Sequence, residues 1–228
     1  MYKKFFKRPI DIFCALAAII VFSWLYVIVA ILVKVKLGSP VIFKQPRPGK
    51  DGKIFTLYKF RTMTDERDAN GNLLPDDIRL TKFGAFLRST SLDELPEAFN
   101  ILFGHMSVVG PRPQLVRDMV FFSDEQMKRQ SVIPGLTGLA QVNGRNDTTW
   151  EQRFEHDLKY IENITFLGDA KLVFLTVWKA FVKSDGISQE GMATAEDFGD
   201  YLLRIGKVDK EEYDKLQEKS KQLLSEVK

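Results

Sequence analysis

The chain is organised around one stretch near its middle, Arg88-Ser89-Thr90-Ser91-Leu92-Asp93-Glu94-Leu95-Pro96. Two adjacent carboxylates, Asp93 and Glu94, follow a polar turn and open an apolar helical pattern that runs to Phe103. We expect both in the first helical turn, where unpaired backbone amides and the helix dipole favour negative charge. Ser91 and Glu94 also have the spacing of a capping box. On these residues alone, a structural cap and a catalytic pair are the two interpretations.

The whole chain, at 228 residues, is long enough for one substantial domain with appendages. Its net charge of +3 is too small to indicate nucleic-acid binding, and no nucleic-acid motif is present, so we expect no nucleic-acid partner. One cysteine, Cys14, excludes a disulfide framework and indicates a reducing compartment. His105 and His156 lack the spacing of metal ligands.

The residues from Ile12 to Val33 form an apolar run without a charge, which predicts insertion into a membrane. The run is longer than a signal-peptide core and ends in lysines, so we expect it to stay in the mature protein. Basic residues flank both ends, and such flanks prefer the cytoplasmic side. This symmetry favours a helix that breaks near Ser23, dips and returns; a straight spanning helix of about 33 Å is the alternative.

The soluble part begins with extended segments. Residues 41–43 and 53–60 predict a hairpin whose turn passes through Pro46, Pro48, Gly49 and Gly52. Residues 65–79 are polar and predict a surface loop or lid, without the register of a calcium loop. Apolar spacing predicts helices over 80–89, 95–103, 150–161 and 172–182, the last either in the core or on a membrane surface.

Two dense loops offer ligand-binding side chains. In Gly110-Pro111-Arg112-Pro113, two prolines stiffen the backbone around an arginine suited to grip phosphate; an exposed turn is the alternative. Between Pro134 and Arg145, three glycines leave backbone amides open to close approach, while Gln141, Asn143 and Arg145 supply side-chain donors. The second loop matches neither a Walker A loop nor a dinucleotide fingerprint.

Together these motifs resemble the small monotopic phosphoglycosyl transferases of bacteria, such as the enzyme that starts protein N-glycosylation in Campylobacter, and the wider bacterial sugar transferases. The matching segments occur in family order over roughly residues 1 to 195. They are residues 7–12, 58–63, 91–96, 110–113 and 134–145. Two positions depart from the pattern: Ser23-Trp24 stands where the Campylobacter-type enzyme has Ser-Pro, and His105 where relatives often have Asp.

The resemblance implies a mainly helical α+β fold with a membrane-embedded N-terminal helix, re-entrant or spanning, and a cytosolic catalytic domain. The expected divisions are residues 1–37 for the membrane helix, 38–185 for the catalytic domain and 186–228 for a polar extension. Asp209 and Glu212 predict the cap of a final docking or self-association helix in that extension. The implied location is the cytoplasmic face of the bacterial inner membrane.

The resemblance also implies a reaction. A phosphosugar moves from a UDP-sugar, expected to carry an N-acetylated amino sugar, to polyprenol phosphate in the bilayer, and UMP is released. Downstream glycosyltransferases are expected to extend the lipid-linked product. Asp93 is the expected nucleophile, with Glu94 and Asp93 near Mg²⁺. The expected phosphate- or nucleotide-binding residues are Arg88, Arg112, Arg145, Lys59, Gln141 and Asn143. A membrane scaffold without catalysis and a nucleotide-sugar hydrolase are the rival functions.

Overall fold

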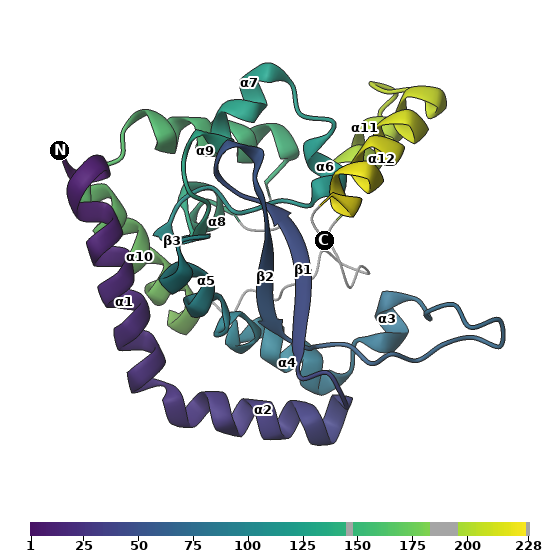
Figure 1. Cartoon of the computed structure of the whole chain (residues 1–228), viewed down its shortest axis with the longest axis horizontal. Helices are drawn as coiled ribbons and strands as arrows, with labels where there is room; N and C mark the ends of the chain where they lie inside the picture. Colours follow the sequence, from purple (N-terminus) through teal and green to yellow (C-terminus); the bar gives the residue numbers. More distant parts are fainter. Residues whose placement is uncertain (145–147, 183–195, 227–228) are drawn as a thin grey trace.

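The computed structural model of the protein describes residues 1–144, 148–182 and 196–226. It is the mainly helical α+β fold that we predict from the sequence (Figure 1). The helices are α1 Lys7–Val21, α2 Ser23–Leu37, α3 Asp76–Arg79, α4 Lys82–Ser89, α5 Glu97–Phe103, α6 Val116–Met119, α7 Asp124–Met127, α8 Leu139–Val142, α9 Trp150–Glu162, α10 Phe166–Val182, α11 Phe198–Arg204 and α12 Lys210–Ser225. The strands are β1 Ile42–Pro48, β2 Ile54–Phe60, β3 Ser107–Val109 and β4 Gly135–Thr137.

The predicted hairpin is present as the antiparallel pair β1 and β2, but its turn lies further along the chain than expected. Pro46 and Pro48 belong to β1 and pair with Thr56 and Ile54, and the turn is a short 3₁₀ segment, Lys50–Gly52. Prolines are tolerated there because β1 is an edge strand, whose outward N–H groups have no partner strand. A second sheet, β3 paired in parallel with β4, was not predicted because three-residue strands carry too little pattern.

The N-terminal segment forms two helical arms that meet at Phe22 with a bend of 64°. The break therefore lies next to Ser23, as the re-entrant interpretation expects, although no proline causes it. The bend has a tertiary reason: α1 buries Ala15 against Ile101, whereas α2 buries Val33 against Leu87. Because the two arms pack on different parts of the body, a single straight helix could not satisfy both contacts.

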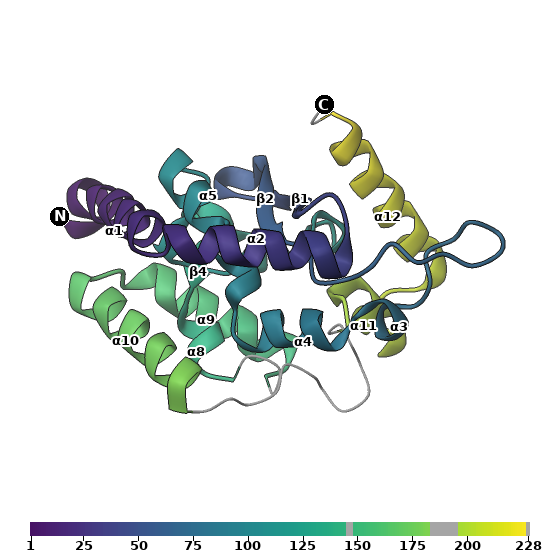
Figure 2. The same ribbon diagram turned by 90° about the horizontal axis from the view of Figure 1, so that it is seen from below.

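No helix in the described part of the chain is by itself long and apolar enough to cross a bilayer, but α1 and α2 taken together are, as a bent pair. Both arms expose large apolar side chains, including Phe13, Ile20, Trp24 and Val35. The helix α10 buries Leu172 in the core and exposes apolar residues that include Leu167, Phe174 and Trp178, so it has one face in the core and one on the surface. Figure 2 shows α1, α2, α4 and α10 together from below.

Residues 65–79 form an arm that projects away from the body (Figure 1). Isolated bridges, Met63 with Leu80 and Arg67 with Leu73, hold its two sides together, and α3 ends it. The sequence prediction of a surface loop is confirmed.

The C-terminal helices dock on the same molecule. Asp209 accepts a hydrogen bond from the Glu212 amide at 2.8 Å, which confirms the predicted cap of α12. Phe198 and Leu202 of α11 share an aromatic core with Phe121, Trp150 and Phe154. The extension is therefore packed on the body through α11, with α12 lying against α6.

Candidate active site

The acidic pair lies where three segments of the chain converge. Asp93 and Glu94 belong to a 3₁₀ turn, Leu92–Glu94, directly before α5. Lys59 reaches them from β2, and Arg112 from the loop that follows β3. Asn100 of α5 is fully buried, accepts a hydrogen bond from the Tyr58 amide at 3.0 Å and donates one to the Thr56 carbonyl at 2.7 Å. This contact fixes the helix that carries the pair against the hairpin.

The predicted capping box is wrong. Ser91 has left-handed backbone angles, φ 56° and ψ 19°, and its side chain caps no amide. The Glu94 carboxylate instead binds cations that are distant in sequence, Lys59 and Arg112. A left-handed serine reverses the chain between α4 and the acidic turn, at an energetic cost that non-glycine residues pay mostly where the surrounding structure demands it.

Glu94 is the anionic centre of an ion-pair network. Its Oε1 atom accepts from Lys59 Nζ at 2.9 Å and from Arg112 Nη2. Lys59 Nζ also lies 3.1 Å from Glu97 Oε1. Although burial acts to raise it, Arg112 and Lys59 hold the pKa of Glu94 well below its usual range. Glu94 is therefore a permanent carboxylate that orients two cations.

Asp93 differs from its neighbour. It is 8 % exposed, and in the described part of the chain no hydrogen bond or ion pair engages its carboxylate. Burial and the neighbouring charge of Glu94 raise its pKa to about 6, against the opposing effect of Lys59, Arg112 and Arg88. A desolvated carboxylate without a fixed partner, among three cationic side chains, can attack an electrophile or bind a metal ion.

The other predicted ligand residues fall into two groups. Arg88 lies at the end of α4, donates from Nε to Thr62 Oγ1 at 3.0 Å, and has a pKa lowered by burial and raised in part by Asp93. The structure thus brings together Asp93, Glu94, Arg88, Lys59 and Arg112. Asn143 donates instead to the Leu139 carbonyl at 2.8 Å, and the Gln141 amide is covered and has no hydrogen-bond partner among the described residues. Arg145 lies outside the described residues.

In the second loop, the amide of Gly135 is already bound within the protein and is not open to a ligand. Gly135 and Gly138 pack against the backbone of Gly110, and a Cβ atom on Gly135 would lie 2.0 Å from the Gly110 nitrogen. The Gly135 amide donates to the Pro111 carbonyl at 2.9 Å, and the Gly110 amide to Thr137 at 2.8 Å. Gly135 and Gly138 therefore allow the second loop and the arginine loop to pack closely.

Sequence reasoning missed Glu97, a buried carboxylate whose pKa burial raises to about 7, with Lys59 opposing. Its position three residues after Glu94, on the same helical face, was the available signal. His105, the departure noted above, stacks on Phe55 with ring centroids 5.7 Å apart. Its role is packing.

The carboxylates of the site offer few ligands for the expected magnesium ion. Among the described residues, no three or more His, Cys, Asp or Glu side chains gather as a metal site. Mg²⁺ commonly takes one or two carboxylates and completes its shell with water and substrate phosphates. Asp93, which has no partner in the described part of the chain, fits as such a ligand, whereas Glu94 already neutralises Lys59 and Arg112. The residues fit an ion that arrives with its phosphate substrate.

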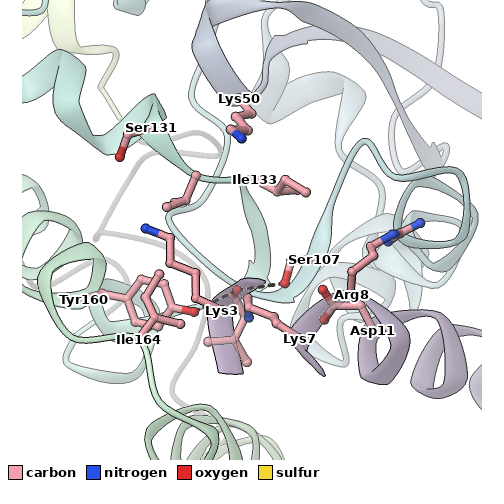
Figure 3. Close-up of a pocket in the computed structure, with 12 residues that line it drawn as sticks. Lys3, Lys7, Arg8, Asp11, Lys50, Ser107, Ser131, Ile133, Tyr160 and Ile164 are labelled. Carbon is pink, nitrogen blue, oxygen red and sulfur yellow. Dashed lines mark hydrogen bonds between the residues drawn. The ribbon is translucent and has the colours of Figure 1, made fainter. Parts of the chain in front are cut away.

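A separate cavity of about 120 Å³ lies near the other end of α5 (Figure 3). Its lining combines apolar and aromatic side chains, with Ile133 and Tyr160 among them, and charged ones that include Lys3 and Lys50. Arg8 turns away from it to donate to the carbonyls of Ile101 and Leu102 at the end of α5. Neither member of the acidic pair lines this cavity.

Comparison with known proteins identifies the class to which this fold and site belong. Residues 2–183 match the family model described as bacterial sugar transferase. The Bacillus subtilis (strain 168) protein named uncharacterized sugar transferase EpsL is 50% identical over 192 residues, covering 84% of this chain and 95% of that protein. The UDP-glucose:undecaprenyl-phosphate glucose-1-phosphate transferase of Klebsiella pneumoniae is 46% identical over 187 residues, covering 78% of this chain and 40% of that protein. The undecaprenyl-phosphate galactose phosphotransferase of Salmonella typhimurium is 37% identical over 200 residues, covering 80% of this chain and 42% of that protein.

The chain therefore belongs to the bacterial sugar transferase family. The resemblance inferred from the motifs is confirmed, and the protein is an enzyme of the phosphoglycosyl transferase class. The chain spans nearly all of the Bacillus relative but less than half of the Klebsiella and Salmonella relatives. Because the family match ends at residue 183, α11 and α12 lie beyond it.

Proposed function

We propose that this enzyme transfers a sugar phosphate from a UDP-sugar to polyprenol phosphate through a covalent intermediate on Asp93. The observation that carries the proposal is the contrast within the acidic pair: Glu94 is bound by two cations, and Asp93 has no partner among the described residues. One Asp93 oxygen attacks the sugar-linked phosphorus, the bond from that phosphorus to UMP breaks, and UMP leaves. An oxygen of the lipid phosphate then attacks the same phosphorus, which forms the diphosphate and frees the carboxylate.

The cations of the site have separable tasks in this proposal. Arg112, whose side chain is 37% exposed, is accessible to bind substrate phosphate, while Glu94 fixes the direction of its guanidinium. Lys59 and Arg88 offset the repulsion between the Asp93 carboxylate and a diphosphate. Bound beside Asp93, Mg²⁺ would supply further charge neutralisation at the phosphates. The unpartnered Gln141 amide and Asn143 are candidates for the nucleotide, as is Arg145.

Incubation of enzyme with UDP-sugar alone tests the covalent step. We expect UMP release in an amount proportional to enzyme, because the first half-reaction needs no acceptor. Release only when polyprenol phosphate is present would contradict the intermediate. UMP release that never loads the lipid would favour the hydrolase, and no release at all would favour the scaffold. A panel of UDP-sugars distinguishes the expected N-acetylated amino sugar from the glucose and galactose named for two relatives.

The rate of UMP release should depend on pH through Asp93. Its pKa is raised to about 6 by burial and by Glu94. Only the ionised carboxylate is a nucleophile, so kcat/KM should fall about tenfold per pH unit below that value and level off above it. A profile measured between about pH 5 and pH 8 checks the prediction. A rate that stays constant over this range would exclude Asp93 as the titrating nucleophile.

We also propose that α1 and α2 enter the cytoplasmic leaflet of the bacterial inner membrane and return, with the catalytic region on the cytoplasmic face. The support is the 64° bend, the exposed apolar side chains of both arms and the basic flanks. This placement brings the site to the level of a lipid-borne phosphate.

Cysteine labelling tests that topology. In a Cys14→Ser background, Lys4→Cys and Lys44→Cys place single thiols at exposed positions on either side of the arms. Both should react with an impermeant maleimide in inside-out vesicles and neither in right-side-out vesicles. Opposite labelling of the two positions would establish a spanning helix instead.

A further inference from the structure

The loop that carries Arg112 is fastened to α9 by side chains that never reach the acidic pair. Arg129 Nη2 donates to the Arg112 carbonyl at 2.7 Å. The same guanidinium donates to Asp157 Oδ2 from Nη2 at 2.6 Å and from Nε at 2.9 Å. Asp157 lies on α9, and both side chains are at most 4% exposed. One turn further along α9, Tyr160 donates to the Val109 carbonyl at 3.0 Å. Both ends of the arginine loop are therefore fixed to this helix.

We propose that Arg129, oriented by Asp157, is a positioning residue that sets the place of the Arg112 guanidinium in the site. The inference rests on the proposed function, in which Arg112 binds substrate phosphate. The Arg129–Asp157 pair is the part of the molecule that holds the Arg112 side chain at a fixed position relative to Asp93. The Arg129–Asp157 pair contacts no atom of the acidic pair and acts only through the Arg112 backbone.

The prolines on either side of Arg112 make such an anchor necessary. They restrict the backbone angles of the loop, but they do not tie it to the rest of the molecule. Backbone hydrogen bonds to the second loop hold Gly110 and Pro111, and Arg129 adds the tie at Arg112 with a planar donor that spans a carboxylate and a carbonyl at once. On the opposite side, Arg47 donates to the Pro113 carbonyl only at 3.2 Å. The Gly135 amide holds the Pro111 carbonyl at 2.9 Å, whereas the shorter contact from Arg129 is the one that holds the carbonyl of Arg112 itself.

A positioning role of the Arg129–Asp157 pair can be distinguished from a role in folding stability alone. A buried ion pair is weak evidence for stability, because well-packed apolar residues of similar volume often replace it without loss of folding free energy. The aromatic rings of Phe122 and Phe154 lie 5.7 and 6.0 Å from the Arg129 guanidinium, so apolar replacements would face suitable neighbours. If the pair existed for stability alone, its apolar replacement would leave activity intact.

The test is a double-mutant cycle. The paired replacement Arg129→Met with Asp157→Leu should keep the protein folded, by thermal denaturation, while kcat/KM for UMP release falls roughly tenfold to hundredfold, as expected for a misplaced binding group. Adding Arg112→Ala to this variant should cause little further loss, because residues that act as a unit are not additive. Arg129→Lys, which cannot span both acceptors with one ammonium, is the second variant and should show the same non-additivity. Lys128→Met, an exposed neighbour, is the matched control and should retain wild-type kinetics.

The outcomes distinguish this inference from the proposed function. Wild-type activity in the apolar pair and in Arg129→Lys would overturn the positioning role. A loss that multiplies fully with that of Arg112→Ala would overturn it as well, while leaving Arg112 a phosphate ligand. If Arg112→Ala alone leaves kcat/KM unchanged, the proposed role of Arg112 fails and the positioning role fails with it.

Discussion

Asp93→Asn is expected to abolish UMP release and at the same time to stabilise the fold. Loss of a nucleophile from a residue group that acts as a unit costs on the order of 10⁴-fold or more in rate. The amide has nearly the shape of the carboxylate but cannot form the bond to phosphorus. Turnover above a few per cent of wild type would place the nucleophile elsewhere, and Glu97, the other buried carboxylate beside Lys59, would be the next residue to replace.

The gain in stability follows from the sign of the pKa shift. Burial and Glu94 raise the pKa of Asp93 to about 6 from 3.8, so the folded state binds this proton more tightly than the unfolded state. Protonated Asp93 therefore contributes to the free energy of unfolding. This contribution is fully present below about pH 4 and is lost as the pH rises through about 6. At neutral pH the ionised side chain therefore costs up to about 3 kcal/mol, which a neutral amide removes. We expect Tm to rise by several degrees, at roughly 2–4 °C per kcal/mol.

Asp118→Asn is the matched control for this experiment. Asp118 is also buried, with a pKa raised to about 7 mainly by burial and then by Asp197. It accepts a hydrogen bond from the Phe198 amide at 2.8 Å, a contact that an asparagine oxygen can keep. The control should raise Tm in the same way but retain activity. Loss of activity in both variants would indicate a general effect of removing buried charge.

Local patterns predicted the elements of this fold better than the geometry of its site. The helix α9 and the cap at Asp209 were predictable because their signals lie within one helical turn. The position of Glu94 was not, because its partners lie 35 and 18 residues away in sequence and outcompete the local capping box. The bend at Phe22 has a similar cause, since packing of the two arms on different cores replaces the missing proline.

The anchoring of Arg112 shows the same limit. Arg112 could be selected from its two flanking prolines, but nothing in the local sequence connects it to Arg129 or to Asp157. Those contacts join segments 17 and 28 residues apart, and they exist only once α9 has packed beside the arginine loop. Motif residues are therefore accessible to sequence reasoning, whereas the residues that hold them in place are not.

The second large effect is expected at Asp169, a buried carboxylate on α10 that accepts three side-chain donors. Lys7 Nζ lies 2.5 Å from Oδ2, the Tyr2 hydroxyl 2.8 Å from Oδ2 and the Tyr160 hydroxyl 2.9 Å from Oδ1. Asp169→Ala removes every acceptor at once and leaves the Lys7 ammonium, 12% exposed, without its counter-ion. Breaking a buried pair by removing one partner costs about 3–5 kcal/mol.

That cost is a large fraction of the 5–15 kcal/mol that typically separates folded from unfolded protein, so Asp169→Ala should lower Tm by roughly 10 °C. Asp169→Asn retains the oxygen acceptor and should lose less. Adding Lys7→Met to Asp169→Ala removes the uncompensated charge and should recover part of the loss, because the penalty lies in the unpaired ammonium and not in the missing attraction. Thermal denaturation in detergent measures all three variants. A Tm within about 2 °C of wild type for Asp169→Ala would show that the start of α1 is held to the body by apolar packing and not by this carboxylate.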